Sequence, residues 1–152
     1  MKIWLLTHSE ELKKINGTGQ LVKQALKEEC TIIEWSRVSP SKDILALPTN
    51  NTLLVYLCEN AQSSLTRESV NKIENIILID GTWQQARKIH NHSPYLKRFP
   101  YYEIQGEQSI YSKRRNQKKI GLCTAEVAIH FLKLHQHSKT DALIESFSEF
   151  NQ

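Results

Sequence analysis

The sequence predicts a single α/β domain in which one mostly parallel sheet is flanked by helices. Short apolar segments alternate with segments of helical periodicity, as expected for strands joined by crossover helices. Residues 76–79, Ile-Ile-Leu-Ile, are apolar without a break, which is typical of a central parallel strand covered on both faces. The chain has 152 residues, 39% of them hydrophobic, and this size suits one domain with its own core.

The first half of the chain is predicted to contain three strands and one helix. The strands are expected at Ile3–Leu6, Thr31–Trp35 and Thr52–Leu57. A helix is expected from Thr18, as its N-cap, to about Lys27. Four residues would form its apolar face: Leu21, Val22, Ala25 and Leu26. Residues 40–48, bracketed by two prolines, are expected to form a loop.

The second half is predicted to begin with the strand Ile76–Ile79, which ends at Asp80. The next expected elements are a helix over Thr82–Asn91, a short helix opened by Ser93 and Pro94, a strand over Tyr101–Gln105 and a cationic loop over Gly106–Gly121. Thr124 would then cap a helix whose inward residues are Val127, Ala128, Phe131, Leu132 and Leu134. Ser138 and Asp141 would form a capping box on a last helix, with Leu143, Ile144, Phe147 and Phe150 on its apolar face.

Composition excludes several classes of protein. No apolar run approaches the roughly 18 residues of a membrane span, and the N-terminal segment lacks the features of a signal peptide. Cys30, Cys58 and Cys123 are far apart, so neither a disulfide framework nor a thiolate zinc site is expected. We therefore expect a soluble, cytoplasmic protein.

Positive charge is concentrated in one segment. Five cations lie within residues 113–119: Lys113, Arg114, Arg115, Lys118 and Lys119. The chain has 20 Lys and Arg against 16 Asp and Glu, so without these five the balance would be 15 to 16. One interpretation is a solvated loop. The other, which composition favours, is a surface that contacts phosphates, because clustered cations gain from counterion release on nucleic acid.

Asp80 is the first candidate for chemistry. It ends an apolar strand and precedes a helix, which is where open α/β sheets place their ligand sites. A carboxylate there is costly unless it has a partner or a task. The alternative is an Asp that caps the following helix. Trp83, on the first turn of that helix, is either a core residue or a ring that faces a ligand.

Other candidates carry weaker signals. The helix entries at residues 16–19 and 121–124 follow glycines, so their amides would either hold an anion or form ordinary turns. The histidines near the C-terminus, His130, His135 and His137, do not have the spacing of a metal site. Cys123 has no histidine beside it in sequence to act as a base.

The segment from Asp80 to Trp83, continued by Gln85-Ala86-Arg87-Lys88, resembles the D-x-T-W signature of the DTW-domain family. Six further segments resemble motifs of that family in order: His8–Glu11 (H-P-x-E), Asn16–Leu21 (N-T-G-R-L), Leu54–Cys58 (L-L-Y-P), Ser93–Pro100 (N-P-x-L and L-P), Tyr111–Arg114 (Y-x-x-R) and Leu122–Glu126 (L-S-T-x-E-A). The chain departs from these motifs at five positions: Ser9, Gly17, Cys58, Cys123 and Val127.

The resemblance implies a SPOUT-like fold with a C-terminal trefoil knot that binds S-adenosylmethionine, in a single domain over residues 1–152. It also implies transfer of the 3-amino-3-carboxypropyl group of S-adenosylmethionine to N3 of a uridine in tRNA, without a metal. Many members of the family carry an N-terminal zinc-binding cysteine cluster, which this sequence does not contain.

The resemblance also assigns roles to individual residues. Asp80 is expected to be the catalytic base for the N3 proton. The expected cofactor-binding residues are Thr18, Leu57, Gly81, Thr82, Trp83, Tyr111, Leu122, Cys123 and Thr124. The expected RNA contacts are Arg87, Lys113, Arg114 and Arg115. We expect tRNA and S-adenosylmethionine as partners of a monomer that has no membrane contact.

Three other functions stay open at this point. A SPOUT-type RNA methyltransferase would use the same cofactor and transfer a different carbon. A non-catalytic RNA-binding module would bind RNA without the cofactor. A plain globular scaffold with a solvated basic loop is the third.

Overall fold

The computed structural model describes residues 1–13, 17–55, 72–102, 104 and 123–152, with Trp83 described by its backbone alone. These residues form one five-stranded sheet whose strand order is β2-β1-β4-β3-β5. The strands are β1 (Lys2–Thr7), β2 (Cys30–Glu34), β3 (Thr52–Val55), β4 (Asn75–Asp80) and β5 (Tyr101–Tyr102). Every strand pair is parallel. The predicted α/β class and the predicted strands are therefore confirmed within the described residues.

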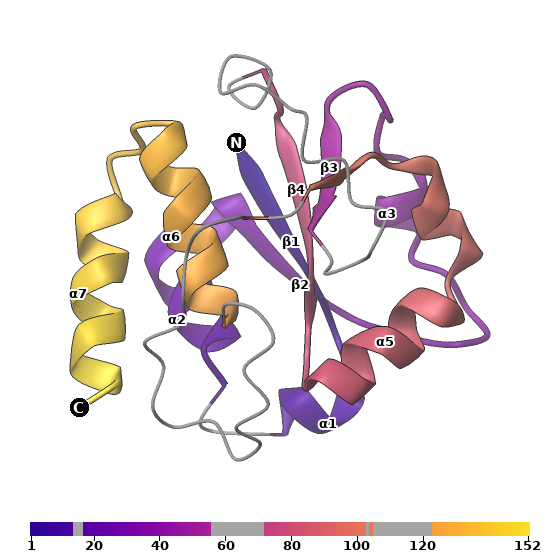
Figure 1. Cartoon of the computed structure of the whole chain (residues 1–152), viewed down its shortest axis with the longest axis horizontal. Helices are drawn as coiled ribbons and strands as arrows, with labels where there is room; N and C mark the ends of the chain where they lie inside the picture. The colour runs from indigo at the N-terminus through magenta and orange to yellow at the C-terminus, as the bar shows by residue number, and fades with distance from the viewer. Residues whose placement is uncertain (14–16, 56–71, 103, 105–122) are drawn as a thin grey trace.

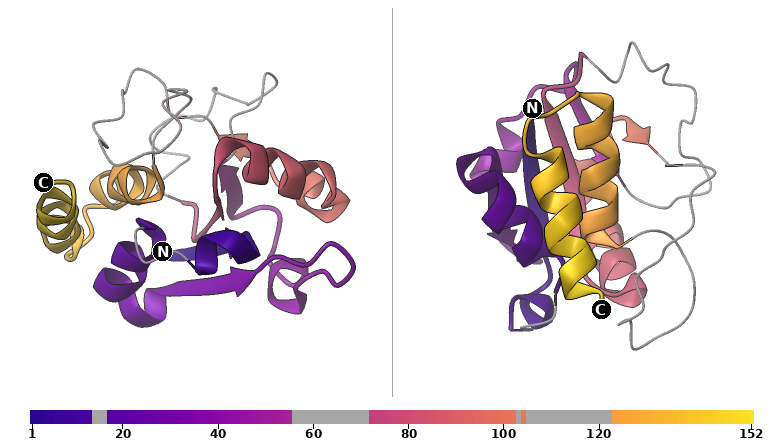
Figure 2. Two further views of the ribbon diagram at one scale, coloured as in Figure 1. Left: turned by 90° about the horizontal axis from the view of Figure 1, so that it is seen from below. Right: turned by 90° about the vertical axis from the view of Figure 1, so that its left-hand side faces the viewer.

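Described helices separate β1 from β2, β2 from β3 and β4 from β5, and two more helices follow β5. They are α1 (Ser9–Leu12), α2 (Gly19–Leu26), α3 (Lys42–Leu45), α5 (Trp83–Asn91), α6 (Thr124–Leu134) and α7 (Thr140–Phe150), with 3₁₀ turns at Lys27–Glu29 and Pro94–Arg98. Figures 1 and 2 show α2, α6 and α7 on one face of the sheet and α3 and α5 on the other.

Two apolar layers hold these helices against the sheet. On β1, Ile3 and Leu5 pack towards α2, α6 and α7, whereas Trp4 and Leu6 pack towards α3 and α5. The central strand β4 divides in the same way, and its residues Ile76 and Ile77 are both fully buried. Because consecutive side chains of a strand point to opposite faces, a strand with both faces covered must be apolar throughout. This explains the unbroken run at residues 76–79.

The sheet has a topological switch point between β1 and β4. The chain leaves β1 towards β2 on one side, and it leaves β4 towards β5 on the other side. Thr7 and Asp80, the last residues of the two strands, pair in register. Ligands of open α/β sheets bind in the crevice that such a divergence leaves at the carboxyl ends of the strands. Figure 1 shows α1 and the first turn of α5 beside this end of the sheet.

Several predicted helix starts are wrong. The N-cap of α6 is Cys123, and Thr124 is the first residue of the helix. The N-cap of α7 is Lys139, without a side-chain cap, because the helix begins at Thr140, whose hydroxyl donates to the carbonyl of His137 at 2.7 Å. The predicted capping box of Ser138 and Asp141 is therefore absent from this described helix. The apolar face of α7 is also narrower than predicted, since Leu143 and Phe147 are buried whereas Ile144 is 36% exposed.

Two short helices were not predicted. The imidazole Nδ1 of His8 accepts the backbone N–H of Glu10 at 3.1 Å and caps α1. The hydroxyl of Ser41 accepts the N–H of Ile44 at 3.4 Å and caps α3, inside the segment expected to be a loop. A four-residue helix is too short to show helical periodicity in the sequence.

The predicted cationic loop over Gly106–Gly121 and part of the predicted strand over Tyr101–Gln105 lie outside the described residues. The SPOUT-like assignment and its trefoil knot stay predictions, because the chain between Ile104 and Cys123 is not described. In the part of the chain that is described, no helix is long and apolar enough to cross a membrane.

Candidate functional site

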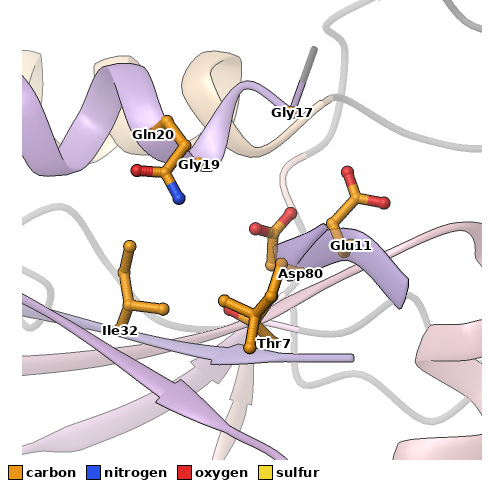
Figure 3. A pocket seen from close by; sticks show the side chains of 8 residues that line it. Thr7, Glu11, Gly17, Gly19, Gln20, Ile32 and Asp80 are labelled. Carbon is orange, nitrogen blue, oxygen red and sulfur yellow. The ribbon is translucent and has the colours of Figure 1, made fainter. Parts of the chain in front are cut away.

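A small pocket lies at the switch point, at the carboxyl ends of β1 and β4 (Figure 3). Its lining residues are Thr7, Glu11, Leu12, Gly17, Gly19, Gln20, Ile32 and Asp80. The empty space measures about 220 Å³, including the part that opens to solvent. Most of that space is open to solvent, and the enclosed part is about the size of one water molecule.

Asp80 stands at the base of this pocket and is 7% exposed. Its Oδ1 accepts the hydroxyl of Thr124 at 2.7 Å, and its carbonyl accepts the N–H of His8 at 3.1 Å. A Cβ added at Gly19 would overlap Oδ2 of Asp80, so only glycine fits beside this carboxylate. The carboxylate thus lies between the first residues of α2 and α6. The positive ends of two helix dipoles favour negative charge at that place.

The helix-cap interpretation of Asp80 is wrong. The cap of α5 is Thr82, whose hydroxyl accepts the N–H of Gln85 at 3.2 Å. In return, Gln85 Oε1 accepts the N–H of Thr82 at 2.8 Å, which completes a capping box. Gly81 allows this box to close tightly, because an added Cβ would lie 2.9 Å from Gln85 Oε1. Asp80 is therefore not the N-cap of α5.

The sequence predicts Thr18 as the N-cap of α2. Thr18 does occupy that position, but its side chain makes no capping hydrogen bond to α2. Its backbone is already helical, with φ −72° and ψ −15°, which turns its hydroxyl away from the first turn of α2. The hydroxyl instead accepts the N–H of Ala125 at 3.2 Å, in the first turn of α6. Thr18 is 5% exposed. Its side chain therefore joins the starts of two helices.

Cys123 is not poised as a nucleophile. Burial raises the pKa of its thiol to about 12, and the nearby Glu126 carboxylate adds to that increase. The thiol is therefore protonated at neutral pH, whereas a nucleophilic cysteine needs a thiolate. Its structural role is clear, since Cys123 and Glu126 form the capping box of α6, with Cys123 N donating to Glu126 Oε1 at 3.0 Å.

Glu11 lines the pocket although the sequence assigned it no role, and the same is true of Thr7, Leu12, Gln20 and Ile32. Glu11 lies on α1, and an added Cβ at Gly17 would lie 3.1 Å from its Oε1. Figure 3 shows the Glu11 and Asp80 carboxylates on the same side of the sheet edge, near the backbone of Gly17 and Gly19. The available signal was the resemblance of His8–Glu11 to H-P-x-E. The pocket therefore presents two acidic side chains to a ligand.

The predicted RNA contacts are described only in part. Arg87 lies on the exposed side of α5, together with Gln84, Lys88 and Asn91, at the spacing of one helical stripe. Arg98 is exposed, and its Nη2 donates to the carbonyls of Ile44, Leu45 and Leu47 at 3.0, 2.5 and 3.2 Å. Lys113, Arg114 and Arg115 lie outside the described residues.

The remaining predicted cofactor contacts divide in the same way. Thr124 contacts Asp80 through its hydroxyl, Gly81 and Thr82 follow Asp80 in the chain, and Trp83 is the first residue of α5. Leu57, Tyr111, Leu122 and the side chain of Trp83 lie outside the described residues. Within the described ranges, no three His, Cys, Asp or Glu side chains are grouped so that they could hold a metal ion.

Comparison with protein families gives one informative result. The model of the DTW domain matches residues 1–152. No solved structure gives a significant match to the chain. The family match covers the strand end at Asp80, the helix start at Thr124 and the pocket between them.

Proposed function

Because this chain belongs to the DTW-domain family, the family of tRNA-uridine aminocarboxypropyltransferases, we propose that it transfers the 3-amino-3-carboxypropyl group of S-adenosylmethionine to N3 of a uridine in tRNA. The family supports a role in tRNA modification. The observation that carries the finer proposal is the buried Asp80 carboxylate at the base of a small pocket at the switch point.

The proposed reaction is a displacement at carbon. A bond forms between uridine N3 and the terminal carbon of the aminocarboxypropyl chain, and the bond between that carbon and sulfur breaks. The sulfur keeps the electron pair and leaves as the thioether methylthioadenosine. S-adenosylmethionine supplies the electrophile, a sulfonium with three reactive carbons. The protein selects one of them by positioning, since alignment of the reacting atoms governs such reactions.

Asp80 is proposed as the catalytic residue that takes the N3 proton. Uridine N3 carries a proton at neutral pH, so a positioned base assists the attack. The starts of α2 and α6 favour the ionised carboxylate that this role requires. The N-cap of α5 is Thr82 and not Asp80.

The pocket suits the amino acid end of the cosubstrate. The carboxylates of Glu11 and Asp80 complement a positive group, such as an ammonium or a sulfonium. The backbone at Thr18, where α2 begins, complements a carboxylate. The hydroxyl of Thr18 and the thiol of Cys123 already serve inside the protein, so both residues would contact the cosubstrate through their backbones.

The rest of the cosubstrate site remains a proposal from the family. Main-chain groups of Leu57, Gly81, Leu122 and Thr124 would frame the adenosine. Thr82, Trp83 and Tyr111 would complete the site, with the Trp83 ring facing the sulfonium by cation–π attraction of roughly 0.5–2 kcal/mol. Arg87 and the cations at 113–115 would bind tRNA phosphates.

Two of the three competing functions predict different outcomes of the reaction with S-adenosylmethionine. A SPOUT-type methyltransferase would leave S-adenosylhomocysteine, and an RNA-binding module would consume no S-adenosylmethionine. The decisive experiment incubates the purified protein with S-adenosylmethionine and unmodified tRNA, and then identifies the released nucleoside and the digested tRNA nucleosides by mass spectrometry. Methylthioadenosine together with aminocarboxypropyluridine supports the proposal. S-adenosylhomocysteine, or product with ribosomal RNA in place of tRNA, contradicts it.

A further inference from the structure

The hydroxyl of Thr124 holds the carboxylate of Asp80 at one oxygen. The two residues are 44 positions apart, and their hydrogen bond of 2.7 Å joins the start of α6 to the end of β4. At the other oxygen, Oδ2, Asp80 lies against Gly19, where any side chain would displace it. The carboxylate is therefore held from two sides by two different helices.

Thr124 is not needed as a cap for its own helix. The capping box of Cys123 and Glu126 serves the first turn of α6. The hydroxyl of Thr18 takes a further N–H of that turn, the one from Ala125. The Thr124 hydroxyl instead donates to Asp80. Its position is therefore better explained by what it does for Asp80 than by helix stability.

We propose that Thr124 is a positioning residue that fixes the rotamer of the Asp80 carboxylate through the hydrogen bond from its hydroxyl to Oδ1. This role rests on the proposed function of the site. Hydrogen bonds to an ionised oxygen are short and strong, so one such bond can hold a buried side chain in a single orientation. Misplacement of a catalytic group by about 1 Å costs on the order of 100-fold in rate.

The test compares Thr124→Val with Thr124→Ser. Valine keeps the shape and removes the donor, whereas serine keeps the donor. We expect Thr124→Val to lower single-turnover release of methylthioadenosine by about 10- to 100-fold, with affinity for S-adenosylmethionine within a few-fold of wild type. Thr124→Ser should restore the rate. Thr140→Val is the matched control, because Thr140 is also the first residue of a helix and donates a 2.7 Å hydrogen bond, in its case to the carbonyl of His137.

A double-mutant cycle asks whether Thr124 acts through Asp80. In an Asp80→Asn background, Thr124→Val should cause little further loss of rate, because residues that work as a unit are not additive. If Thr124→Val does not fold, Gly19→Ala decides the matter, since its Cβ would displace Oδ2 while every hydrogen-bond donor stays in place. Gly19→Ala should show the same loss of rate.

Each contrary result has its own meaning. A wild-type rate in Thr124→Val, or a loss that adds fully to that of Asp80→Asn, overturns the positioning role and leaves the proposed function intact. A loss of affinity in place of rate makes Thr124 a binding residue and also overturns it. A wild-type protein that releases no methylthioadenosine with tRNA overturns the proposed function, and the role of Thr124 with it.

Discussion

The hydroxyl of Thr18 accepts the backbone N–H of Ala125 at 3.2 Å, so a residue at the start of one helix binds the first turn of another helix, 107 positions away. Both residues are buried. The contact ties the first turn of α2 to the first turn of α6, and the Asp80 carboxylate lies between these two turns. The stability of the fold and the geometry of the pocket therefore depend on the same contact.

Thr18→Val should destabilise the protein by about 1–3 kcal/mol, because it leaves the buried N–H of Ala125 without an acceptor. Thr18→Ser should recover most of that loss, since it keeps the oxygen. The measurement is urea unfolding of the three proteins. Equal midpoints for Thr18→Val and wild type would show that water or another group replaces the hydroxyl.

Arg98→Ala should also destabilise the protein by about 1–3 kcal/mol, the usual effect of losing hydrogen bonds to a charged group. Three carbonyls at the end of α3 and just after it would lose their shared donor. Arg98→Lys should recover little, because an ammonium lacks the planar fork of a guanidinium. The neighbouring Lys97→Ala is the control, since Lys97 is exposed like Arg98 and the three carbonyls accept from Arg98. If Lys97→Ala costs as much in urea unfolding, the carbonyl contacts of Arg98 are not the cause.

The strands could be predicted because buried strands appear in the sequence as short apolar runs. The position of the site could be predicted as well, since Asp80 ends the most apolar strand and such strand ends carry ligands. The partners of Thr18 and Thr124 could not be predicted, because each lies on a distant segment. Glu11 was not assigned either, since α1 has four residues and a histidine cap, and neither feature has a recognisable pattern. Strands and long helices could therefore be predicted, whereas short helices, several helix starts and the side-chain contacts that join the elements could not.

Glu29 should make the stability of the protein depend on pH in the acid range. The hydrogen bond from His137 at 2.8 Å lowers the pKa of Glu29 below its usual 4.5, and the charge of Lys139 acts in the same direction. A lowered folded pKa means that the stabilisation is present above the unfolded pKa and is lost as pH falls through the folded value. Wild type should therefore be more stable than Glu29→Gln near neutral pH, and the two should converge as pH falls below 4.5.

The measurement for Glu29 is thermal unfolding of both proteins over a pH series. The difference is expected to be small, because the Glu29 side chain is 35% exposed and solvent screens the pair. Glu28→Gln, the adjacent exposed carboxylate, is the control. A gap between wild type and Glu29→Gln that widens in acid would contradict the assigned sign.

Lys113, Arg114 and Arg115 changed together to Ala should weaken tRNA binding regardless of sequence and flatten its salt dependence. Each lost phosphate contact should reduce the slope of log K against log salt by about 0.7–0.9. Binding isotherms at several salt concentrations give the slope, with Lys133→Ala, an exposed cation of α6, as the control. An unchanged slope would favour the other interpretation of residues 113–119, an ordinary solvated loop. Arg87→Ala with Lys88→Ala tests the exposed stripe of α5 in the same assay.

Asp80→Asn separates chemistry from structure at the centre of the site. Asparagine keeps the shape of aspartate, and its carbonyl oxygen can still accept the hydrogen bond that Thr124 gives to Oδ1 at 2.7 Å. It cannot take a proton from uridine N3.

If Asp80 is the base, single-turnover release of methylthioadenosine should fall by roughly 10²–10⁴-fold in Asp80→Asn while affinity for S-adenosylmethionine is retained. If Asp80 only braces the starts of α2 and α6, Asp80→Asn should keep both. Alanine would be a poorer choice, since it would remove the acceptor for the Thr124 hydroxyl and the base together. Calorimetric titration with S-adenosylmethionine, alongside the rate, distinguishes the cases: full activity refutes the base assignment, and lost affinity with an unchanged rate at saturation makes Asp80 a binding residue.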